Sequence, residues 1–257
     1  MSYLYGTTGL SEVTNALLLK TLLKPEVEMS ENMETEGSQK VENGSEVLLP
    51  TLSKWSTPAI LPSAWCSTDF LVGAGMVIIQ QNTHKIVMIH APDWERKWFF
   101  PRGRKDVGET IEQAALREAF EESGYRAQLL PLLNPTTQPF PPASMGNIES
   151  ALNVEPIFLT TTLYNGVYLT SWFVGQIPED AAVDTSRERM PSEENFQTHL
   201  LSYEEAMQKV NGSEIDVLQY AWDIYQKTLE FVAERRAQDI SNIYNLGSGT
   251  KDMPSYT

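Results

Sequence analysis

Cysteine, histidine and basic residues are all scarce in this chain. Its 257 residues include one cysteine, Cys66, and three histidines. A single cysteine excludes an intrachain disulfide and a zinc site built from several cysteines, and it fits a reducing compartment. Lys and Arg number 19 against 34 Asp and Glu, which gives a formal net charge of −15. Nucleic acids and anionic membranes are bound through basic surfaces, so neither is an expected partner. A small phosphorylated substrate held in a local basic pocket remains compatible with this charge.

Long apolar runs are also missing. The segment ALLLKTLL at residues 16–23 is interrupted by Lys20 and has no basic residue before it, so it does not resemble a signal peptide. The sequence has no apolar stretch near the roughly 18 residues that a membrane span requires. We therefore expect no membrane partner and a cytoplasmic location, with a nuclear location left open.

Composition divides the chain into three parts. Residues 1–60 are expected to form a largely flexible N-terminal appendage, because 25–46 is acidic and nearly free of large apolar groups. Residues 61–240 are expected to form one domain, and residues 241–257 a flexible tail. Within the domain, the Pro-rich segment 134–153 is either an insertion that shapes a pocket or a mobile loop, and its sequence favours neither.

Apolar periodicity predicts several strands and two helices in the domain. The Asn165-Gly166 pair predicts a hairpin, and apolar residues at steps of three and four predict a long C-terminal helix. The predicted strands are 70–80, 85–91, 125–133, 157–164, 166–177 and 196–202, and the helices are 203–210 and 213–238, the latter with Ile215, Leu218, Trp222, Tyr225 and Leu229 on its apolar face.

Another helix is predicted between the second and third of these strands. Thr110 is a good N-cap, and Gln113 three residues later completes a capping box. Gly124 suits the left-handed position just beyond a helix end. Leu116 and Phe120, four residues apart, are expected to anchor this helix to a sheet.

Three glutamates crowd one face of this predicted helix. Glu118, Glu121 and Glu122 are spaced i, i+3 and i+4. Like charges this close repel unless a cation compensates them, and hard divalent ions such as Mg²⁺ or Mn²⁺ take oxygen ligands. Arg117 lies four residues before Glu121 and eight after Glu109, so it is expected to hold the acidic group in place. The glutamates therefore predict a Mg²⁺ or Mn²⁺ site.

A basic turn that contains glycine precedes the helix. In PRGRK, Gly103 is flanked by Arg102, Arg104 and Lys105. The three basic side chains are expected to bind phosphates of a substrate, although a solvated turn would have the same composition. A divalent site beside a phosphate clamp predicts metal-assisted hydrolysis, in which an activated water attacks phosphorus and a carboxylate takes its proton.

These residues resemble the Nudix box, G-x5-E-x7-R-E-U-x-E-E-x-G-U, of the Nudix hydrolase (MutT-like) family. All seven fixed positions match over residues 103–125, and only the two U positions, normally Ile, Leu or Val, differ, with Ala119 and Tyr125. The flanking sequence resembles the family less specifically over about residues 66–212. The resemblance implies an α/β fold, a Nudix-type α/β/α sandwich with a mixed β-sheet, for the domain at 61–240.

The resemblance also implies a role for each matching position. The implied metal ligands are the Gly103 carbonyl, Glu118, Glu121 and Glu122. Glu109 and Arg117 are implied to support the loop and the helix. The general base varies in this family. Here it is either Glu118 or a glutamate in the loop after the hairpin, for which Glu193 and Glu194 are the candidates.

The implied activity is hydrolysis of a diphosphate bond in a nucleoside diphosphate linked to another moiety. Pro-Arg-Gly at the box is similar to the pattern in dinucleoside polyphosphate hydrolases, diphosphoinositol polyphosphate phosphohydrolases and mRNA-decapping enzymes, and the acidic net charge disfavours the last. The alternative is a catalytically silent Nudix-fold module that senses nucleotides or binds proteins, but such a module is expected to lose acidic positions that are present here. Trp94 and Trp98 fit base stacking and core packing equally well. The long C-terminal helix leaves a homodimer open.

Overall fold

The computed structural model describes residues 52–57, 63–95, 97–139, 152–163, 166–186 and 193–247, with side chains through residue 239. Nearly all of the predicted appendage, most of the Pro-rich segment and the tail beyond residue 247 lie outside these ranges. The expectations for those segments stay predictions.

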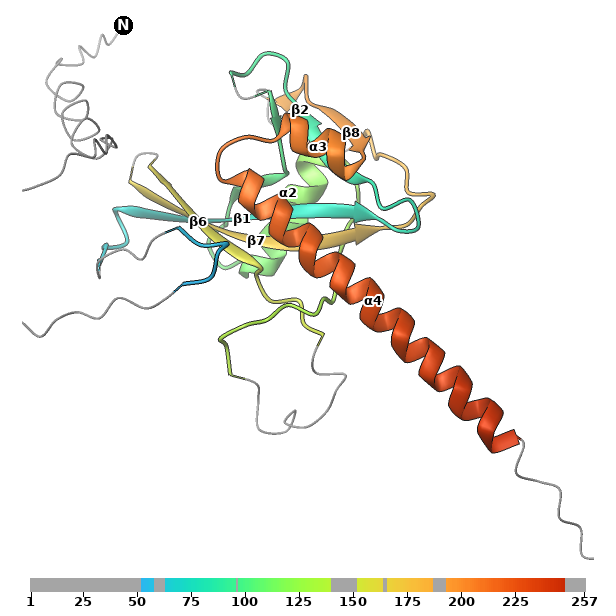
Figure 1. Ribbon diagram of the computed structural model, residues 1–257. Helices are drawn as coiled ribbons and strands as arrows, with labels where there is room; N and C mark the ends of the chain where they lie inside the picture. Colours follow the sequence, from blue (N-terminus) through green and yellow to red (C-terminus); the bar gives the residue numbers. More distant parts are fainter. Residues whose placement is uncertain are drawn as a thin grey trace, which may run out of the picture. The chain divides into compact units, whose positions relative to one another are not determined.

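A mixed β-sheet forms the centre of the described chain (Figure 1). Its strands are β1 (Phe70–Gln80), β2 (Ile86–His90), β3 (Trp98–Phe99), β4 (Arg102–Arg104), β5 (Gln128–Leu129), β6 (Phe158–Leu163), β7 (Val167–Ile177) and β8 (Gln197–Leu201). The main order is β3-β2-β1-β7-β5, with β4 paired to β1, β6 to β7 and β8 to β2. β1 and β7 are parallel along their whole length, and the other named pairs are antiparallel.

Helices cover both faces of this sheet. They are α2 (Ile111–Ser123), α3 (Tyr203–Lys209) and α4 (Glu214–Gly247). Side chains alternate along β1, so Met76 and Ile78 pack towards α2, whereas Val77 and Ile79 pack towards α4. The predicted α/β/α arrangement is therefore confirmed. None of the helices in the described ranges combines the length and apolar character needed to cross a bilayer.

Most predicted elements of the domain form where the sequence places them. The predicted strand 70–80 coincides with β1, and the predicted hairpin forms as β6 and β7. The predicted strand 125–133 is reduced to β5. Beyond it, Pro131 has no N–H to donate to a ladder. The sequence predicts a loop where β3 and β4 form, since strands this short carry no periodic signal.

α4 differs from its prediction in length and at one residue of the predicted apolar face. It continues to Gly247, into the predicted flexible tail, because no Gly or Pro interrupts it after Gly212. Of the predicted apolar face, Leu218 and Tyr225 are buried and Ile215 and Trp222 pack against the core. Leu229 is exposed. The buried residues of α4 are Glu214, Val217, Leu218, Ala221, Ile224, Tyr225 and Thr228.

Candidate active site

α2 presents the predicted glutamates beside the strand that carries the basic residues. Its N-terminus has the predicted capping box. The Gln113 N–H donates to the Thr110 hydroxyl at 3.2 Å, and the Thr110 N–H donates to the Gln113 side chain at 2.8 Å. Gly124 ends the helix in the left-handed conformation, with φ of 78°. These caps fix where α2 begins and ends.

Alanines form most of the contact between α2 and the sheet. Ala114, Ala115 and Ala119 are fully buried there. Leu116 packs only at the edge of this cluster, and Phe120 lies outside it under the Arg126 guanidinium. The expected anchor is therefore wrong for Phe120 and minor for Leu116. Small side chains let the helix approach closely, which explains alanine at the first U position of the box.

β4 and α2 come closest at Gly103. A methyl group on this residue would overlap the Glu118 carboxylate. Glycine here leaves room for the Glu118 carboxylate against the strand, and the Glu118 side chain is only 13% exposed. Burial raises the pKa of Glu118 to about 6; the charges of Glu121 and Glu193 act in the same direction, whereas Arg117 lowers it.

Glu122 is the most deeply buried of the three helix glutamates. It is 6% exposed, and one carboxylate oxygen accepts the Arg102 N–H at 2.8 Å. Burial raises its pKa well above the usual value, and the charges of Glu118 and Glu193 raise it further. Added positive charge would stabilise the anion here, and a divalent ion supplies such charge.

Arg117 connects the helix, the preceding loop and the basic strand. Its Nε and Nη2 each donate to a Glu109 oxygen at 2.9 Å, and these contacts hold the pKa of Glu109 below its usual value. Its Nη1 donates to Glu118 at 2.8 Å and to Glu121 at 3.0 Å. Its Nη2 also donates to the Arg104 carbonyl at 2.8 Å. A single guanidinium therefore orients two of the helix glutamates.

The loop before β8 brings a further carboxylate, that of Glu193, near Glu118 and Glu122. Glu193 is half-buried, and its charge raises the pKa of both Glu118 and Glu122. Its neighbour Glu194 is exposed. We call Glu118, Glu121, Glu122 and Glu193 the acidic cluster.

The carboxylate oxygens of the acidic cluster are suitable ligands for a hard cation. In this structure, however, most of these side chains bind other groups of the protein. Among the described residues, no three carboxylate, imidazole or thiol groups converge as a finished metal site. Glu118 and Glu121 bind Arg117, and Glu122 binds a backbone N–H. Burial and repulsion nevertheless raise the pKa of Glu118 and Glu122, and carboxylate oxygen is the donor that Mg²⁺ and Mn²⁺ prefer.

The backbone of β4 faces this cluster at alternate residues. The Gly103 carbonyl oxygen faces β1, where it lies 2.5 Å from the position that a Cβ of Gly73 would take. The Arg102 N–H and the Arg104 carbonyl point to the outer edge, where side chains of α2 bind them. Because the N–H and C=O of one strand residue share an edge, the carbonyls of Arg102 and Arg104 both point to this outer edge, and Arg117 binds that of Arg104.

The three predicted phosphate-binding residues occupy different surroundings. Arg102 forms an ion pair with the buried Glu214 of α4, and its guanidinium lies 5.9 Å from the Trp172 ring centroid. Lys105 is half-buried and donates to a neighbouring backbone carbonyl at 2.9 Å. Arg104 is exposed. It is therefore the most accessible of the three.

Tyr168 of β7, whose side chain also reaches β4 near Gly103, was not identified from the sequence. Its ring lies across β1, where a side chain on Gly73 would overlap it, just as one on Gly75 would overlap Trp172. Burial raises the pKa of Tyr168, and so does the charge of Glu118. The sequence carried a signal for this, since glycines at alternate positions of a strand mark a face where a neighbouring side chain covers the backbone.

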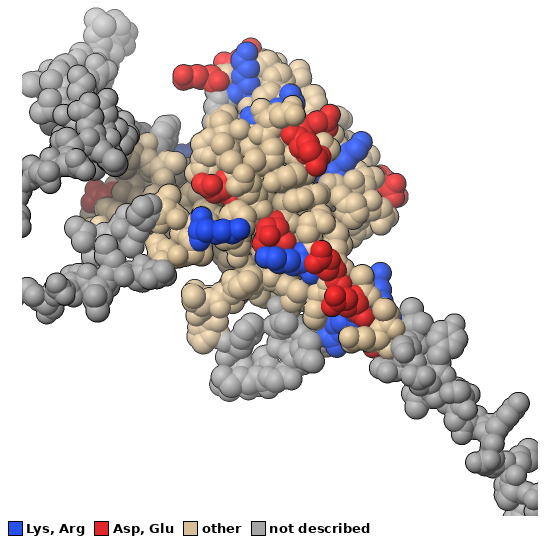
Figure 2. Space-filling view, in the orientation of Figure 1, with Lys and Arg blue, Asp and Glu red and all other residues tan. Residues whose placement is uncertain are grey.

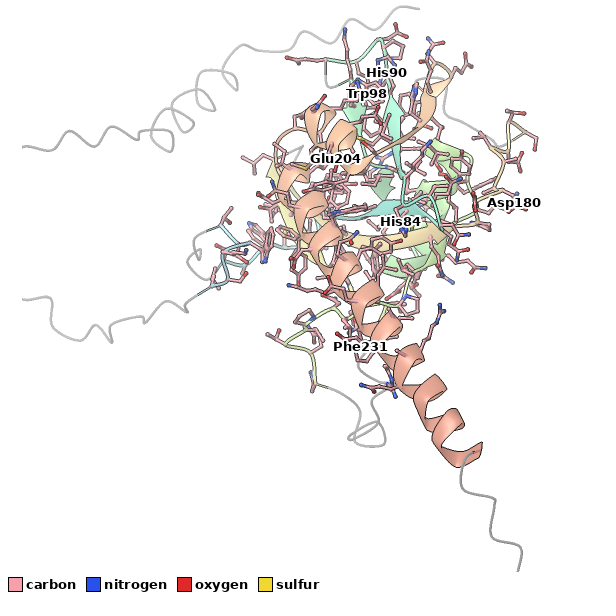
Figure 3. The ribbon with its side chains drawn as sticks, turned by 45° about the vertical axis from the view of Figure 1, so that its right-hand side comes forward. His84, His90, Trp98, Asp180, Glu204 and Phe231 are labelled. Carbon is pink, nitrogen blue, oxygen red and sulfur yellow. The ribbon has the colours of Figure 1, made fainter. Side chains whose placement is uncertain are left out.

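Trp94 and Trp98 belong to two separate aromatic groups. His90 and Trp98 lie together (Figure 3) and stack with ring centroids 4.5 Å apart, and Trp98 also packs against His199. Trp94 stacks on Phe99 at 5.6 Å. Both tryptophans therefore pack against the protein's own side chains.

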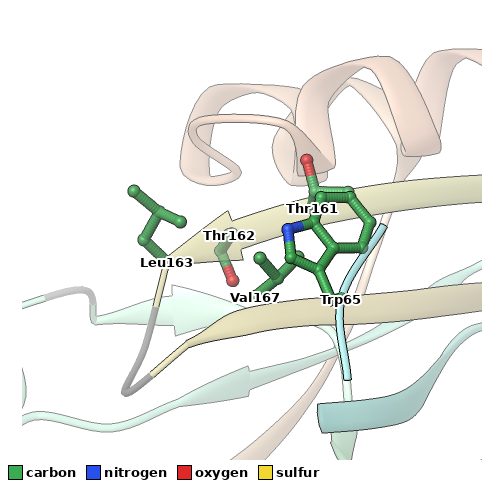
Figure 4. Close-up of a pocket in the computed structure, with 5 residues that line it drawn as sticks. All are labelled: Trp65, Thr161, Thr162, Leu163 and Val167. Atoms are coloured by element: carbon green, nitrogen blue, oxygen red, sulfur yellow. The ribbon is translucent and has the colours of Figure 1, made fainter. Parts of the chain in front are cut away.

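A pocket of about 240 Å³ lies at the β6–β7 hairpin, outside the acidic cluster (Figure 4). It is lined by Trp65, Thr161, Thr162, Leu163 and Val167.

Comparisons with known proteins agree on one family. The family model for the NUDIX domain matches residues 69–213. An RNA pyrophosphohydrolase of Blochmanniella pennsylvanica (strain BPEN) is 42% identical over 65 residues, which are 23% of this chain and 38% of that protein. The chain spans 10% to 38% of the length of the curated relatives that it matches here.

Solved structures are also similar to this chain, at low sequence identity. A NUDIX hydrolase from Nitrosomonas europaea has a TM-score of 0.41 and 19% identity, covering 62% of this chain and 90% of that chain. A binary complex of a C. elegans Ap4A hydrolase has a TM-score of 0.39 and 19% identity, covering 61% of this chain and 98% of that chain. The family model spans more than half of the sequence and contains the complete box at 103–125, so this chain belongs to the Nudix family.

Proposed function

We propose that this chain is a divalent-metal-dependent hydrolase that cleaves a diphosphate bond. The substrate class is a nucleoside diphosphate linked to another moiety, such as a dinucleoside polyphosphate, or a diphosphoinositol polyphosphate. The observation that carries the proposal is the acidic cluster, which lies against β4 beside the exposed Arg104. Family membership and the pyrophosphohydrolase among the relatives support the same class of bond.

Mg²⁺ or Mn²⁺ is the proposed cofactor. The residues proposed to hold it are Glu118, Glu121, Glu122 and a carbonyl of β4. The box resemblance assigns that carbonyl to Gly103, whereas the alternation along β4 favours Arg102 or Arg104. When bound, such an ion neutralises charge on phosphate oxygens and lowers the pKa of a bound water.

The chain's own residues would bind the phosphates and orient the glutamates. Arg104 and Lys105 supply positive charge for the phosphates. Arg102 contributes less, because its guanidinium already forms an ion pair with Glu214. Arg117, with Glu109, keeps the glutamates of α2 in place.

Glu118 and Glu193 are the proposed candidates for the group that accepts the proton of the attacking water. With a pKa of about 6, Glu118 is mostly ionised at neutral pH and still basic enough to take a proton. Glu193 is half-buried beside Glu118 and Glu122. Glu194 is exposed, which makes it the weaker candidate.

The charge distribution favours a small substrate over a long nucleic acid. On the described part of the face in Figure 2, Lys and Arg are interspersed with Asp and Glu and form no continuous basic track. The net charge of the whole chain is −15. A long RNA gains much of its affinity from many phosphate contacts, which this surface does not offer. The proposed activity depends neither on a particular cellular compartment nor on a homodimer.

Detection of products by ³¹P NMR tests the proposal. The full chain would be incubated with Mg²⁺ or Mn²⁺ and dinucleoside polyphosphates, nucleotide sugars, dinucleotide cofactors, capped RNA or diphosphoinositol polyphosphates. We expect metal-dependent cleavage of at least one diphosphate compound. Glu122→Gln should lower kcat about a thousandfold, because a lost metal ligand removes several kcal/mol of transition-state stabilisation.

Glu112→Gln is the matched control, since it removes a carboxylate from the first turn of the same helix. It should leave the rate close to that of the unchanged chain. No cleavage of any compound by a chain that still binds Mg²⁺ would reject the hydrolase and favour a binding module.

A further inference from the structure

One aromatic side chain approaches the proposed site from the face of the sheet opposite α2. Tyr168 is four residues from Trp172 on β7, so both side chains lie on the face that α4 covers. The Tyr168 ring lies over β1, where Gly73 has no side chain that would overlap it. It therefore extends from β7 across β1 towards β4.

The position of the hydroxyl is defined by Gly73. A Cβ on Gly73 would overlap the Tyr168 hydroxyl and would lie 2.5 Å from the Gly103 carbonyl oxygen. The hydroxyl and the Gly103 carbonyl are therefore close neighbours. On its other face, Gly103 is in contact with the Glu118 carboxylate. The phenol thus reaches β4 at the residue where α2 reaches it from the other side.

Basic side chains share this face of the sheet with Tyr168. β4 pairs with β1 so that Arg104 is opposite Gly73 and Arg102 is opposite Gly75. Paired residues point to the same face, so both arginines emerge beside the phenol. The charges of both arginines lower the pKa of Tyr168, whereas those of Glu118 and Glu122 raise it.

The hydroxyl has no hydrogen-bond partner among the described residues. Two tyrosines of α4 do have one: the hydroxyl of the buried Tyr225 is 2.7 Å from His84 Nδ1, and the hydroxyl of the half-buried Tyr220 is 3.4 Å from Asn134. A half-buried phenol that reaches a polar site without a partner is placed to donate to a ligand.

We propose that Tyr168 is a substrate-binding residue whose hydroxyl donates a hydrogen bond to a phosphate oxygen, on the face of β4 opposite α2 and beside Arg104. This inference rests on the proposed function, because it assumes a diphosphate at the acidic cluster. The phenol is a neutral donor, so it can bind a phosphate oxygen without competing with the carboxylates for a cation. Because the bond is made before and during the reaction, Tyr168 contributes to KM more than to kcat.

Isothermal titration of the full chain with methylenediphosphonate, a diphosphate analogue with a carbon bridge, tests this inference in the presence of Mg²⁺. Tyr168→Phe keeps the ring and removes only the hydroxyl. Its Kd should rise about tenfold, the effect of a lost hydrogen bond to a charged group. KM for a cleaved diphosphate substrate should rise by the same factor with kcat unchanged.

Tyr220→Phe is the matched control, since it removes a half-buried hydroxyl on α4 that already has a partner. Its Kd and KM should equal those of the unchanged chain. Equal affinity of Tyr168→Phe and the unchanged chain, or no binding of methylenediphosphonate by the unchanged chain, would overturn the inference. Weaker binding by Tyr168→Phe, in a chain that cleaves no compound of the panel, would support the inference and reject the hydrolase.

Discussion

At the scale of single residues, Arg117 is the side chain on which most of the site depends. It makes five hydrogen bonds of 2.8 to 3.0 Å to Glu109, Glu118, Glu121 and the Arg104 carbonyl. The planar guanidinium can serve partners on several sides at once, which the compact ammonium of lysine cannot.

Arg117→Lys should therefore disorder the glutamates without changing the net charge. We expect kcat/KM to fall about a hundredfold, the effect of roughly 1 Å misplacement in a catalytic group. The free energy of unfolding should fall by about 2 kcal/mol through lost charged hydrogen bonds. Steady-state kinetics and urea unfolding measure the two effects.

Arg126→Lys is the comparison variant, because Arg126 is 74% exposed, forms an ion pair with Asp184 and otherwise lies over the Phe120 ring. Its unfolding free energy should change by less than about 0.5 kcal/mol. Wild-type kcat/KM in Arg117→Lys would show that the guanidinium network does not position the glutamates.

At the scale of elements, the contact between α2 and β4 decides the geometry of the site. Fully buried alanines seat the helix, and glycine at position 103 lets the Glu118 carboxylate lie against the strand. The position of the carboxylates thus depends on how closely two elements pack.

Gly103→Ala should displace the Glu118 carboxylate from its place against the strand. A methyl group there would overlap the Glu118 carboxylate, so we expect kcat/KM to fall about a hundredfold or more. Gly108→Ala is the matched glycine change, since a Cβ at Gly108 meets no atom within 4 Å. It should cost about 1 kcal/mol of stability, because Gly108 has φ of 86°, but little activity. Equal activity of the two variants would contradict the steric role of Gly103.

The boundaries of α2 were predictable because their causes are local. The Thr110–Gln113 capping box and the left-handed Gly124 act within a few residues of the helix ends. The face that α2 buries was not predictable in the same way. Whether Leu116, Phe120 or the alanines meet the sheet depends on the surface that the sheet presents.

At the scale of the whole molecule, burial of acidic groups makes stability depend on pH and on metal. Burial raises the pKa of Glu118 to about 6 and that of Glu122 well above its usual value. The folded chain therefore holds these protons more tightly than the unfolded chain, whose glutamates titrate near about 4.3. The stabilisation is complete below that value and is lost as pH rises through the folded pKa values.

The metal-free chain should therefore unfold at a lower temperature at about pH 8 than at about pH 5. Glu122→Gln should reduce this difference, because the amide does not titrate. Mg²⁺ at about 100 times its Kd should restore about 2.7 kcal/mol to the unchanged chain at pH 8, and much less to Glu122→Gln. Calorimetry of both chains, with Glu112→Gln as the control, measures these shifts. If Glu122→Gln left the pH dependence of stability unaltered, that dependence could not come from the buried Glu122 carboxylate.

The sequence by itself determined the box, the identity of its glutamates and arginine, the ends of α2 and the positions of β1, β6 and β7. These features depend on residue chemistry, side-chain periodicity and caps that extend over a few residues. Tertiary structure alone decided that the Arg102 N–H binds Glu122, that Glu193 joins the acidic cluster and that Tyr168 lies over Gly73. Each of these contacts joins residues far apart in the chain, and each depends on strand register. A shift of one residue would turn every side chain of a strand to the other face.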